Sequence, residues 1–474
     1  MIKEKIEIIL TVVLTILLLI LKMCFEEKEL IVILITSLNI IYLAYRMRER
    51  KKNIMIFYFS ICNFIFNTSI SLTKIVKNEY ILNSMFFTNR VPYTKEISKF
   101  VYNILILNNL GILIGIIIIY FLKSVKNRYK IRTEKKIILK YITFILLISF
   151  IFVLKENLNN IKEVIRIGYV ASYLRVQDKN LSYYIITIFS IFFTIYLGVK
   201  PTKNKKMIIV LIVSILIAFI SSFSGSRGKF LIQLVFFIWY LEVQGYFKIK
   251  KRYAIILVFL VFIYSSKLVN IRENYGKSSY SVNKIENLKI KELPLQFLES
   301  QNGTASLIGY LKIFPEIIEG ENYGKMILGF YYTFYDSFFR KELLIKNKSK
   351  EVGEKISNVS RISYIVNYDY VRKGSGLGGN YIVEMYEVGR ETGVLFFSSF
   401  FVLLIFYLEN LFKKDKSIYI NIFVLMVFEV IFMAPRSIYF DFSIRQYLWI
   451  CLCYFILSNF IKQIKIKKIE NIRE

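Results

Sequence analysis

The sequence contains no histidine among its 474 residues, and this absence excludes several kinds of catalytic site at once. Ser-His-Asp triads, Cys-His pairs, HExxH zinc sites and imidazole general bases all require that side chain. Any acid or base in a reaction of this chain is therefore expected to be a carboxylate.

Aspartate and cysteine are also scarce. The aspartates are only five in number and form no D-x-D motif, and no Walker A sequence occurs, which argues against metal-dependent or ATP-driven chemistry. The four cysteines lie in or beside apolar runs, with no spacing typical of a disulfide framework or a zinc site. We therefore expect neither a metal site nor a cofactor.

Apolar residues, by contrast, are abundant. They make up 55% of the chain against 21% charged residues, and the mean hydropathy is +0.50, too apolar for a soluble fold. This composition predicts an all-α integral membrane protein with about 12 transmembrane helices. The candidate spans lie near residues 6–21, 30–45, 54–72, 101–122, 137–154, 184–199, 207–223, 230–247, 253–269, 393–412, 417–434 and 447–461.

The 65 Lys and Arg residues outnumber the 34 Asp and Glu residues, giving a formal charge of +31. Such a charge could indicate nucleic-acid binding, but the basic residues gather in every second connecting segment, such as 46–53, 123–136 and 200–206. This distribution follows the positive-inside rule and predicts that both termini face the cytoplasm. We expect contact with membrane lipid and no nucleic-acid partner.

The spans divide the chain into three parts. Residues 1–269 hold the first nine predicted helices, 270–392 form one large outer loop, and 393–474 hold the last three helices and a basic cytoplasmic tail. Patches at 307–318 and 326–339 of the loop are apolar and aromatic, which predicts short amphipathic helices that lie on the bilayer surface or cap the bundle.

Arginines fall at two places on the predicted outer membrane face. Arg227 lies in the turn Ser224-Gly225-Ser226-Arg227-Gly228, which indicates either an anion clamp or a tight hairpin with a snorkelling arginine. Arg436, Asp441 and Arg445 share the loop between the last two spans, where Asp441 and Arg445 could instead form an ion pair. Three arginines at one face would hold a diphosphate.

A glycine-rich segment precedes the tenth span. It contains G-x-G-x-x-G, but no strand or cytosolic βαβ unit surrounds it, so we exclude dinucleotide binding. Backbone N–H groups of Gly376, Gly378 and Gly379 could still bind an anion beside a helix N-terminus.

Asn380 follows these glycines and is a suitable helix N-cap. It would place Glu384 and Glu387, three residues apart, on one face of the helix that follows. These carboxylates could serve as a base, or they could simply complement the helix dipole, with Glu387 paired to Arg390.

The motifs together resemble the O-antigen polysaccharide polymerase (Wzy) family. The resemblance is carried by S-G-S-R-G at 224–228, by G-x-G-G-N-Y-I-x-E-x-Y at 376–386, and by the loop segment 319–334 with its Asn322-Tyr323-Gly324-Lys325. The arginine pair after the eleventh span adds to it. As motifs the likeness covers about residues 200–450, and as topology the whole chain.

The resemblance implies a GT-C-like polytopic bundle with one large periplasmic loop, in the bacterial inner membrane. It implies a glycosyltransferase that takes a growing glycan from undecaprenyl diphosphate and joins it to the next lipid-linked repeat unit. In that reading Arg227, Arg436 and Arg445 bind the diphosphate, and the base is Glu384, then Glu387, then Asp441. The expected glycan-binding side chains are Tyr331, Tyr332, Tyr335 and Tyr381.

The partner implied is an undecaprenyl-diphosphate-linked oligosaccharide, and a chain-length regulator protein is a further candidate. Two other functions stay open. A lipid-linked oligosaccharide flippase has a similar number of spans and needs no base, but charged side chains inside the bundle and a short outer loop would be expected of it. An O-antigen ligase would transfer finished polymer to a different acceptor.

Overall fold

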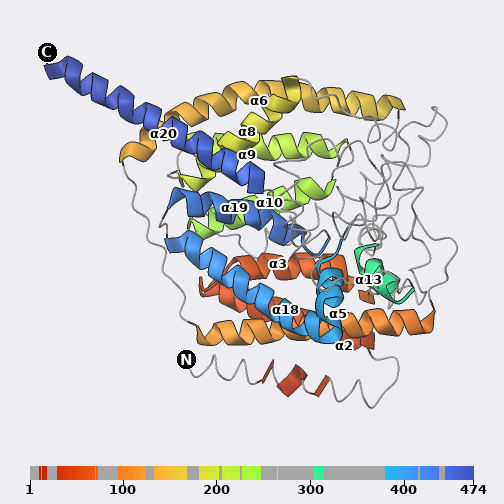
Figure 1. Cartoon of the computed structure of the whole chain (residues 1–474). Helices are drawn as coiled ribbons and strands as arrows, with labels where there is room; N and C mark the ends of the chain where they lie inside the picture. The colour runs from red at the N-terminus through yellow and green to blue at the C-terminus, as the bar shows by residue number, and fades with distance from the viewer. Residues whose placement is uncertain are drawn as a thin grey trace. The chain divides into compact units, whose positions relative to one another are not determined.

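The computed structural model describes residues 10–11, 13–15, 17–18, 29–69, 71–72, 94–122, 133–167, 181–201, 205–224, 227–246, 264, 303–313, 379–414, 417–436 and 444–473. These residues are almost entirely helical, and no strand occurs in the part of the chain so described (Figure 1). The all-α prediction is confirmed for this part.

Ten of the predicted spans overlap apolar helices. Five of those helices are long and apolar enough to cross a membrane, and five are shorter. The long ones begin at Glu29, Lys95, Ile137, Lys205 and Tyr381. The spans predicted at 6–21 and 253–269 fall mostly outside the described residues, so the total of twelve stays a prediction, as do the orientation and the outer placement of the loop.

The chain forms two compact units. Unit 1 contains residues 1–125, 289–410 and 430–441, and unit 2 contains 126–288, 411–429 and 442–474. Each unit therefore combines segments from both halves of the sequence, and two helices run from one unit into the other.

Unit 1 is built around four membrane helices. These are α2 (Glu29–Glu49), α3 (Met55–Asn63) with its continuation η1 (Phe64–Thr68), α5 (Lys95–Phe121), and α18 (Tyr381–Lys414) as far as residue 410. The helix α2 packs on both α3 and α5, and the three run side by side in Figure 1. The short helix α13 (Gly303–Ile313), from the predicted loop, packs on α5 and η1.

Local chemistry explains where the helices of unit 1 begin. Thr94 caps α5 by accepting the Ile97 N–H at 3.3 Å. The start of α3 is capped from a distance in sequence, because the buried carboxylate of Glu409 accepts the N–H groups of Ile54 and Met55 at 3.0 and 2.6 Å. A carboxylate is favourable there since a helix N-terminus carries partial positive charge.

Glycines bring α5 and α18 together. A Cβ at Gly111 would collide with the backbone oxygen of Leu395, and one at Gly115 would lie 2.8 Å from that of Ser399. The two glycines are four residues apart, the small-xxx-small spacing that lets membrane helices approach closely. The long part of α18 is therefore fixed against α5.

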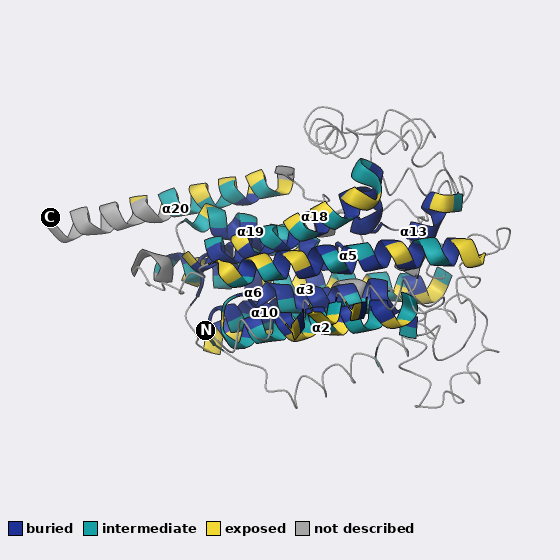
Figure 2. Cartoon of the chain, turned by 90° about the horizontal axis from the view of Figure 1, so that it is seen from below, coloured by how far each residue is buried: buried dark blue, intermediate teal, exposed yellow. Residues whose placement is uncertain are grey.

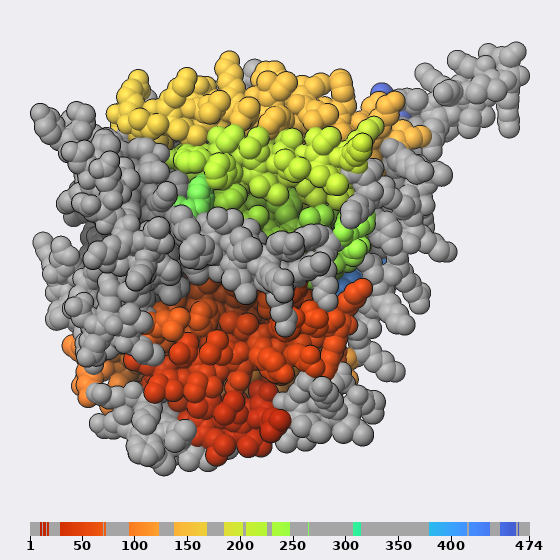
Figure 3. All heavy atoms as spheres, turned by 180° about the vertical axis from the view of Figure 1, so that it is seen from behind, coloured from red at the N-terminus to blue at the C-terminus, as the bar shows by residue number. Residues whose placement is uncertain are grey.

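Unit 2 contains α6 (Thr133–Ile167), α8 (Leu181–Gly198), α9 (Lys205–Ser222), α10 (Arg227–Val243), the first twelve residues of α19 (Ile418–Met433), and α20 (Ile444–Arg473). The helix α6 contacts α8 and α9, and α9 contacts α10. The space-filling view shows α6 and α9 side by side over one face (Figure 3).

An aromatic cluster fills the interior of unit 2. Trp239 is fully buried and stacks on Phe428 with ring centroids 3.5 Å apart, and Phe412 and Tyr240 pack around them. The Tyr240 hydroxyl donates to the Leu197 carbonyl oxygen at 2.9 Å, so the one polar atom of that ring is satisfied.

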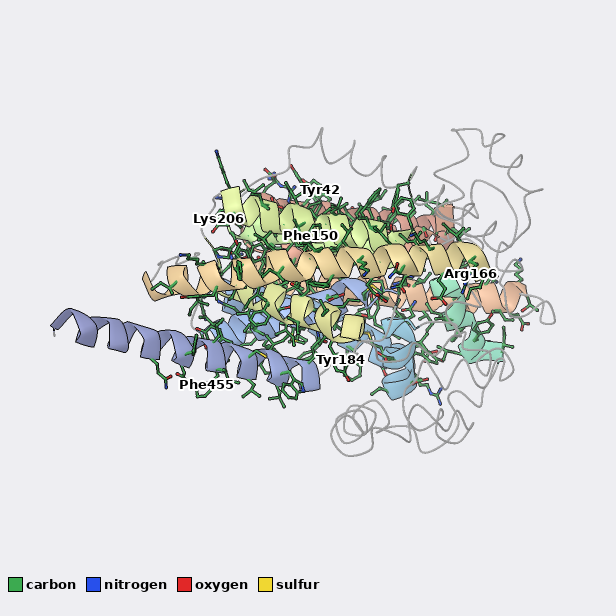
Figure 4. The ribbon with its side chains drawn as sticks, turned by 90° about the horizontal axis from the view of Figure 1, so that it is seen from above. Tyr42, Phe150, Arg166, Tyr184, Lys206 and Phe455 are labelled. Atoms are coloured by element: carbon green, nitrogen blue, oxygen red, sulfur yellow. The ribbon has the colours of Figure 1, made fainter. Side chains whose placement is uncertain are left out.

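The outer surfaces of the helices are apolar along their middles, as expected for contact with lipid tails. Figure 2 shows exposed residues along helices whose inner faces are buried. The exposed apolar side chains include Phe144, Ile148 and Ile151 of α6, Ile208 and Ile212 of α9, and Phe396 and Phe400 of α18. In Figure 4, Lys206 of α9 and Arg166 of α6 lie at opposite ends of these helices, with Phe150 between them.

Candidate functional site

The candidate site lies at the start of α18, where the glycine-led motif enters the helix. The helix begins at Tyr381, twelve residues before the span that hydropathy predicts at 393–412. The predicted cap is confirmed, because the side-chain oxygen of Asn380 accepts the Ile382 N–H at 2.9 Å. Both candidate carboxylates are thus helical residues.

The helix is broken soon after the carboxylates. Gly389 and Arg390 have non-helical backbone angles, and Arg390 has φ 54° and ψ −145°, a conformation that side-chain-bearing residues rarely adopt. The break separates a short head segment, residues 381–388, from the long remainder of α18, and Figure 2 shows the two pointing in different directions. Strained backbone of this kind is frequent at functional sites.

Glycine at 393 lets the head segment fold close to the remainder. A Cβ at this position would lie 2.5 Å from the Met385 backbone oxygen, a distance that real Cβ atoms do not reach. Just beside it, the Tyr386 hydroxyl donates to Glu391 at 3.3 Å, and the Arg390 guanidinium lies 5.8 Å from the centre of the Tyr386 ring. These contacts span the break and hold the two parts of α18 together.

Glu384 and Glu387 are both buried, with 4% and 7% of their surfaces exposed. A carboxylate in an apolar membrane protein is costly unless hydrogen bonds or charges stabilise it, so two in one short segment mark a functional candidate. Among the described residues, no group of three or more Cys, Asp or Glu side chains is arranged to hold a metal ion.

Buried amides and hydroxyls fix the head segment to α3, η1 and α5. The Asn380 amide donates to Asn67 at 2.7 Å, and the Tyr381 hydroxyl contacts the side-chain oxygens of Asn63 and Asn108 at 3.0 and 2.7 Å. The Ser398 hydroxyl, on the long part of α18, donates to the same Asn108 oxygen at 2.8 Å. We call Asn63, Asn67, Asn108, Asn380, Tyr381 and Ser398 the asparagine network.

The chain around Arg436 contacts the head segment and η1 as well. The Tyr381 N–H donates to the Ala434 carbonyl oxygen at 3.1 Å, and Ala434 is two residues before Arg436. The Arg436 guanidinium lies 5.8 Å from the centre of the Phe66 ring on η1. Unit 1 therefore holds the start of the segment that bears Glu384 and the chain that leads to Arg436 against α3 and η1, although these two residues are 52 positions apart in sequence.

The first-turn amides of α18 already have acceptors. The N–H of Tyr381 bonds to Ala434, that of Ile382 to the Asn380 side chain, and those of Val383 and Glu384 to the Asn380 carbonyl oxygen. A phosphate bound here would have to use glycine amides ahead of Asn380. Of the three glycines predicted for that role, Gly379 is described and buried, while Gly376 and Gly378 lie outside the described residues.

Tyr381 lies in the interior of unit 1, and its predicted contact with a glycan stays a prediction. Its ring is fully buried against Phe59 and Phe401, and its hydroxyl contacts two asparagines. These contacts hold the start of the head segment.

The other predicted residues are placed only in part. Arg227 begins α10 and Arg445 is the second residue of α20, both in unit 2, and their side chains are not described. Asp441, Tyr331, Tyr332 and Tyr335 lie outside the described residues. Their convergence with Arg436 and Glu384 stays a prediction.

Sequence reasoning missed the asparagine network. Asn63, Asn67 and Asn108 lie inside long apolar stretches, where polar side chains are expensive and commonly bond across helices. Their position within predicted spans was the signal that could have revealed them. The spacing of Gly111 and Gly115 would likewise have indicated close packing of α5 on another helix.

A family model described as O-antigen polysaccharide polymerase Wzy matches residues 6–468, nearly the whole chain. Searches of curated proteins and of solved structures gave no match. Members of this family are integral membrane proteins that act on lipid-linked oligosaccharide repeat units, which agrees with the apolar helices of both units. The chain belongs to the O-antigen polysaccharide polymerase Wzy family, and its general activity is the polymerisation of O-antigen repeat units.

Proposed function

We propose that the chain is a glycosyltransferase that joins undecaprenyl-diphosphate-linked repeat units at the periplasmic face of the inner membrane, with its reaction centre at the head segment of α18. One observation carries the proposal. Buried Glu384 lies on a segment whose first amide is hydrogen-bonded to the chain that leads to Arg436. A carboxylate and a guanidinium are thereby attached to the same part of unit 1, which supports assigning them the roles of base and anion-binding cation.

In the proposed reaction, Glu384 accepts the proton of the acceptor hydroxyl on the incoming repeat unit. The hydroxyl oxygen then forms a bond to the anomeric carbon of the donor glycan, and the bond from that carbon to the undecaprenyl diphosphate oxygen breaks. The electron pair leaves with the diphosphate. Arg436 stabilises the negative charge that develops there, and Arg227 and Arg445 are the further cations we assign to it.

Burial supports the choice of Glu384 as the base. A carboxylate that is removed from water attracts a proton more strongly than a carboxylate in bulk solvent does. Glu387 is one helical turn further along the same segment and is our second candidate, and Asp441 is the third. The lack of a D-x-D motif in the sequence supports a reaction that needs no metal.

Recognition of the glycan is assigned to the loop. Tyr331, Tyr332 and Tyr335 are aromatic residues that precede the motif-bearing helix in the sequence, and aromatic side chains are suited to binding sugar rings. A regulator of chain length would act on the same loop, because the number of additions depends on how long the growing glycan stays bound.

The test compares Glu384→Gln and Arg436→Ala with the wild type in cells, with Glu96→Gln as the matched control. Glu96 is an exposed carboxylate in the first turn of α5, in the same unit. We expect the first two variants to lose long glycan chains while single lipid-linked units accumulate on the periplasmic leaflet. The control should keep the wild-type chain-length distribution.

The same experiment separates the other two functions. Units retained on the cytoplasmic leaflet would indicate a flippase, and full-length polymer left on undecaprenyl diphosphate would indicate a ligase. Either result contradicts the polymerisation mechanism proposed here.

A further inference from the structure

The helix that carries Asn63 does not continue as an α-helix. Residues Phe64–Thr68 form a π-helical turn, η1, in which the Ser69 N–H bonds to the Phe64 carbonyl oxygen five residues back. Such turns are rare and less favourable than α-helix, and they occur often at functional sites. The contacts of its side chains indicate what the π-helical turn η1 does.

Asn67, in this turn, holds the carboxylate side of the proposed site. It is fully buried, its oxygen accepts the Asn380 amide N–H at 2.7 Å, and its own amide donates to Asn63 at 2.9 Å. Asn63 in turn accepts from the Tyr381 hydroxyl at 3.0 Å. Asn67 and Asn63 thus fix Asn380, the cap of the head segment, and Tyr381, its first residue.

Phe66, the preceding residue, lies on the cation side. Its buried ring is the surface against which the Arg436 guanidinium packs, at 5.8 Å from the ring centre. The quadrupole of an aromatic face attracts a guanidinium and so fixes where its charge lies. Neighbouring side chains of η1 therefore contact both the residue that caps the carboxylate-bearing segment and the guanidinium of Arg436.

We infer that the π-helical turn Phe64–Thr68 is the positioning element of the reaction centre, with Asn67 setting the segment of Glu384 and Phe66 setting the guanidinium of Arg436. This inference rests on the proposed function. It assigns a role to a part of the chain far from the motifs, more than 300 residues before the head segment. Both are positioning residues, because each acts through another side chain.

Substitutions of the two residues should change different kinetic constants. Asn67→Ala frees the head segment and should lower kcat about tenfold to a hundredfold, because a displaced base costs rate rather than affinity. Phe66→Leu removes the aromatic face and should raise the KM for the lipid-linked donor about two- to fivefold with little change in kcat. Phe66→Tyr keeps that face and should restore the wild-type KM.

The measurement uses the full chain in proteoliposomes, with the purified undecaprenyl-diphosphate-linked repeat unit as substrate and rates normalised to folded protein. Asn421→Ala is the matched control. Asn421 is also a buried amide, but it belongs to unit 2 and donates to the Gly198 carbonyl oxygen at 3.0 Å. Its kcat and KM should stay within about twofold of wild type.

A double variant tests whether Asn67 acts through Asn380. If it does, Asn67→Ala combined with Asn380→Ala should be no slower than the slower single variant. Should Asn67→Ala not give folded protein, the change of KM in Phe66→Leu and its reversal in Phe66→Tyr decide the question alone.

The measurements distinguish a failure of the positioning role from a failure of the proposed site. If Glu384→Gln and Arg436→Ala are inactive while Asn67→Ala and Phe66→Leu both behave like Asn421→Ala, the positioning role is overturned and the site stands. If Glu384→Gln and Arg436→Ala stay active, the proposed site itself is wrong, and the role of η1 falls with it.

Discussion

The interiors of the two units of this chain are stabilised by different kinds of contact. Unit 1 joins its helices through buried asparagines, hydroxyls and a carboxylate, whereas unit 2 packs Trp239, Phe428 and Phe412 around one aromatic interior. Aromatic packing stabilises a fold without fixing any one atom, while a buried hydrogen bond requires its partner at a defined position. The unit with the costly polar interior is also the one that carries the carboxylates and Arg436, which indicates that its polar contacts serve positioning.

The largest effect on stability is expected in unit 2. Trp239→Ala would leave a large cavity against Phe428, Phe412 and Tyr240, and should lower the free energy of unfolding by about 3–5 kcal/mol. Thermal unfolding followed by size-exclusion chromatography would measure it. The rate per folded molecule should change little, and a loss of rate with unchanged stability would contradict the comparison.

In unit 1, overpacking of the α5 and α18 contact should be the next largest effect. Gly115→Val places methyl groups against the Ser399 backbone oxygen and Val402, and should cost about 1–3 kcal/mol. Because this contact fixes the long part of α18, we expect activity to fall together with stability. The exposed Phe400→Ala on the same helix is the control, and it should leave both near wild type.

Tyr381→Phe should lower the free energy of unfolding by about 1–2 kcal/mol. It should lower the polymerisation rate by more than this loss of stability explains. The change keeps the ring between Phe59 and Phe401 and removes only the hydroxyl that contacts Asn63 and Asn108. Parallel measurement of thermal stability and of polymerisation rate would check it. A variant that loses stability yet polymerises at the wild-type rate would show that the asparagine network is structural only.

The smallest effect should follow from Lys200→Met in unit 2. The buried Lys200 ammonium donates to the Phe412 carbonyl oxygen and lies 4.1 Å from the centre of the Phe412 ring, near the C-terminal end of α18. We expect a loss of about 1 kcal/mol in stability, since methionine keeps the apolar contacts. A polymerisation rate that fell more than this loss explains would assign Lys200 a role beyond packing.

Much of the fold follows from hydropathy, because lipid imposes one strong requirement on every crossing. The predicted spans near 101–122 and 137–154 overlap the longer helices α5 and α6, and Asn380 caps its helix as expected. The start of α18 at Tyr381 was not apparent as a span, since the head segment carries two carboxylates and lowers the local hydropathy.

The arrangement of the site depended on contacts that no local pattern encodes. The pairing of Asn67 with Asn380 joins residues 313 positions apart, and the break at Gly389 and Arg390 sits in sequence that is otherwise compatible with a helix. The π-helical turn is equally invisible, because Phe-Ile-Phe-Asn-Thr has no feature that distinguishes it from an α-helical turn. Tertiary contacts chose these conformations over local preference.

The most direct test of a carboxylate base at the head segment is the initial rate of glycosidic bond formation by Glu384→Gln in proteoliposomes supplied with purified lipid-linked repeat unit. The amide is nearly the same size and cannot accept the hydroxyl proton, so the folded variant should be about 10²- to 10⁴-fold slower than wild type. A rate within about twofold of wild type would contradict the account and remove Glu384 from the reaction.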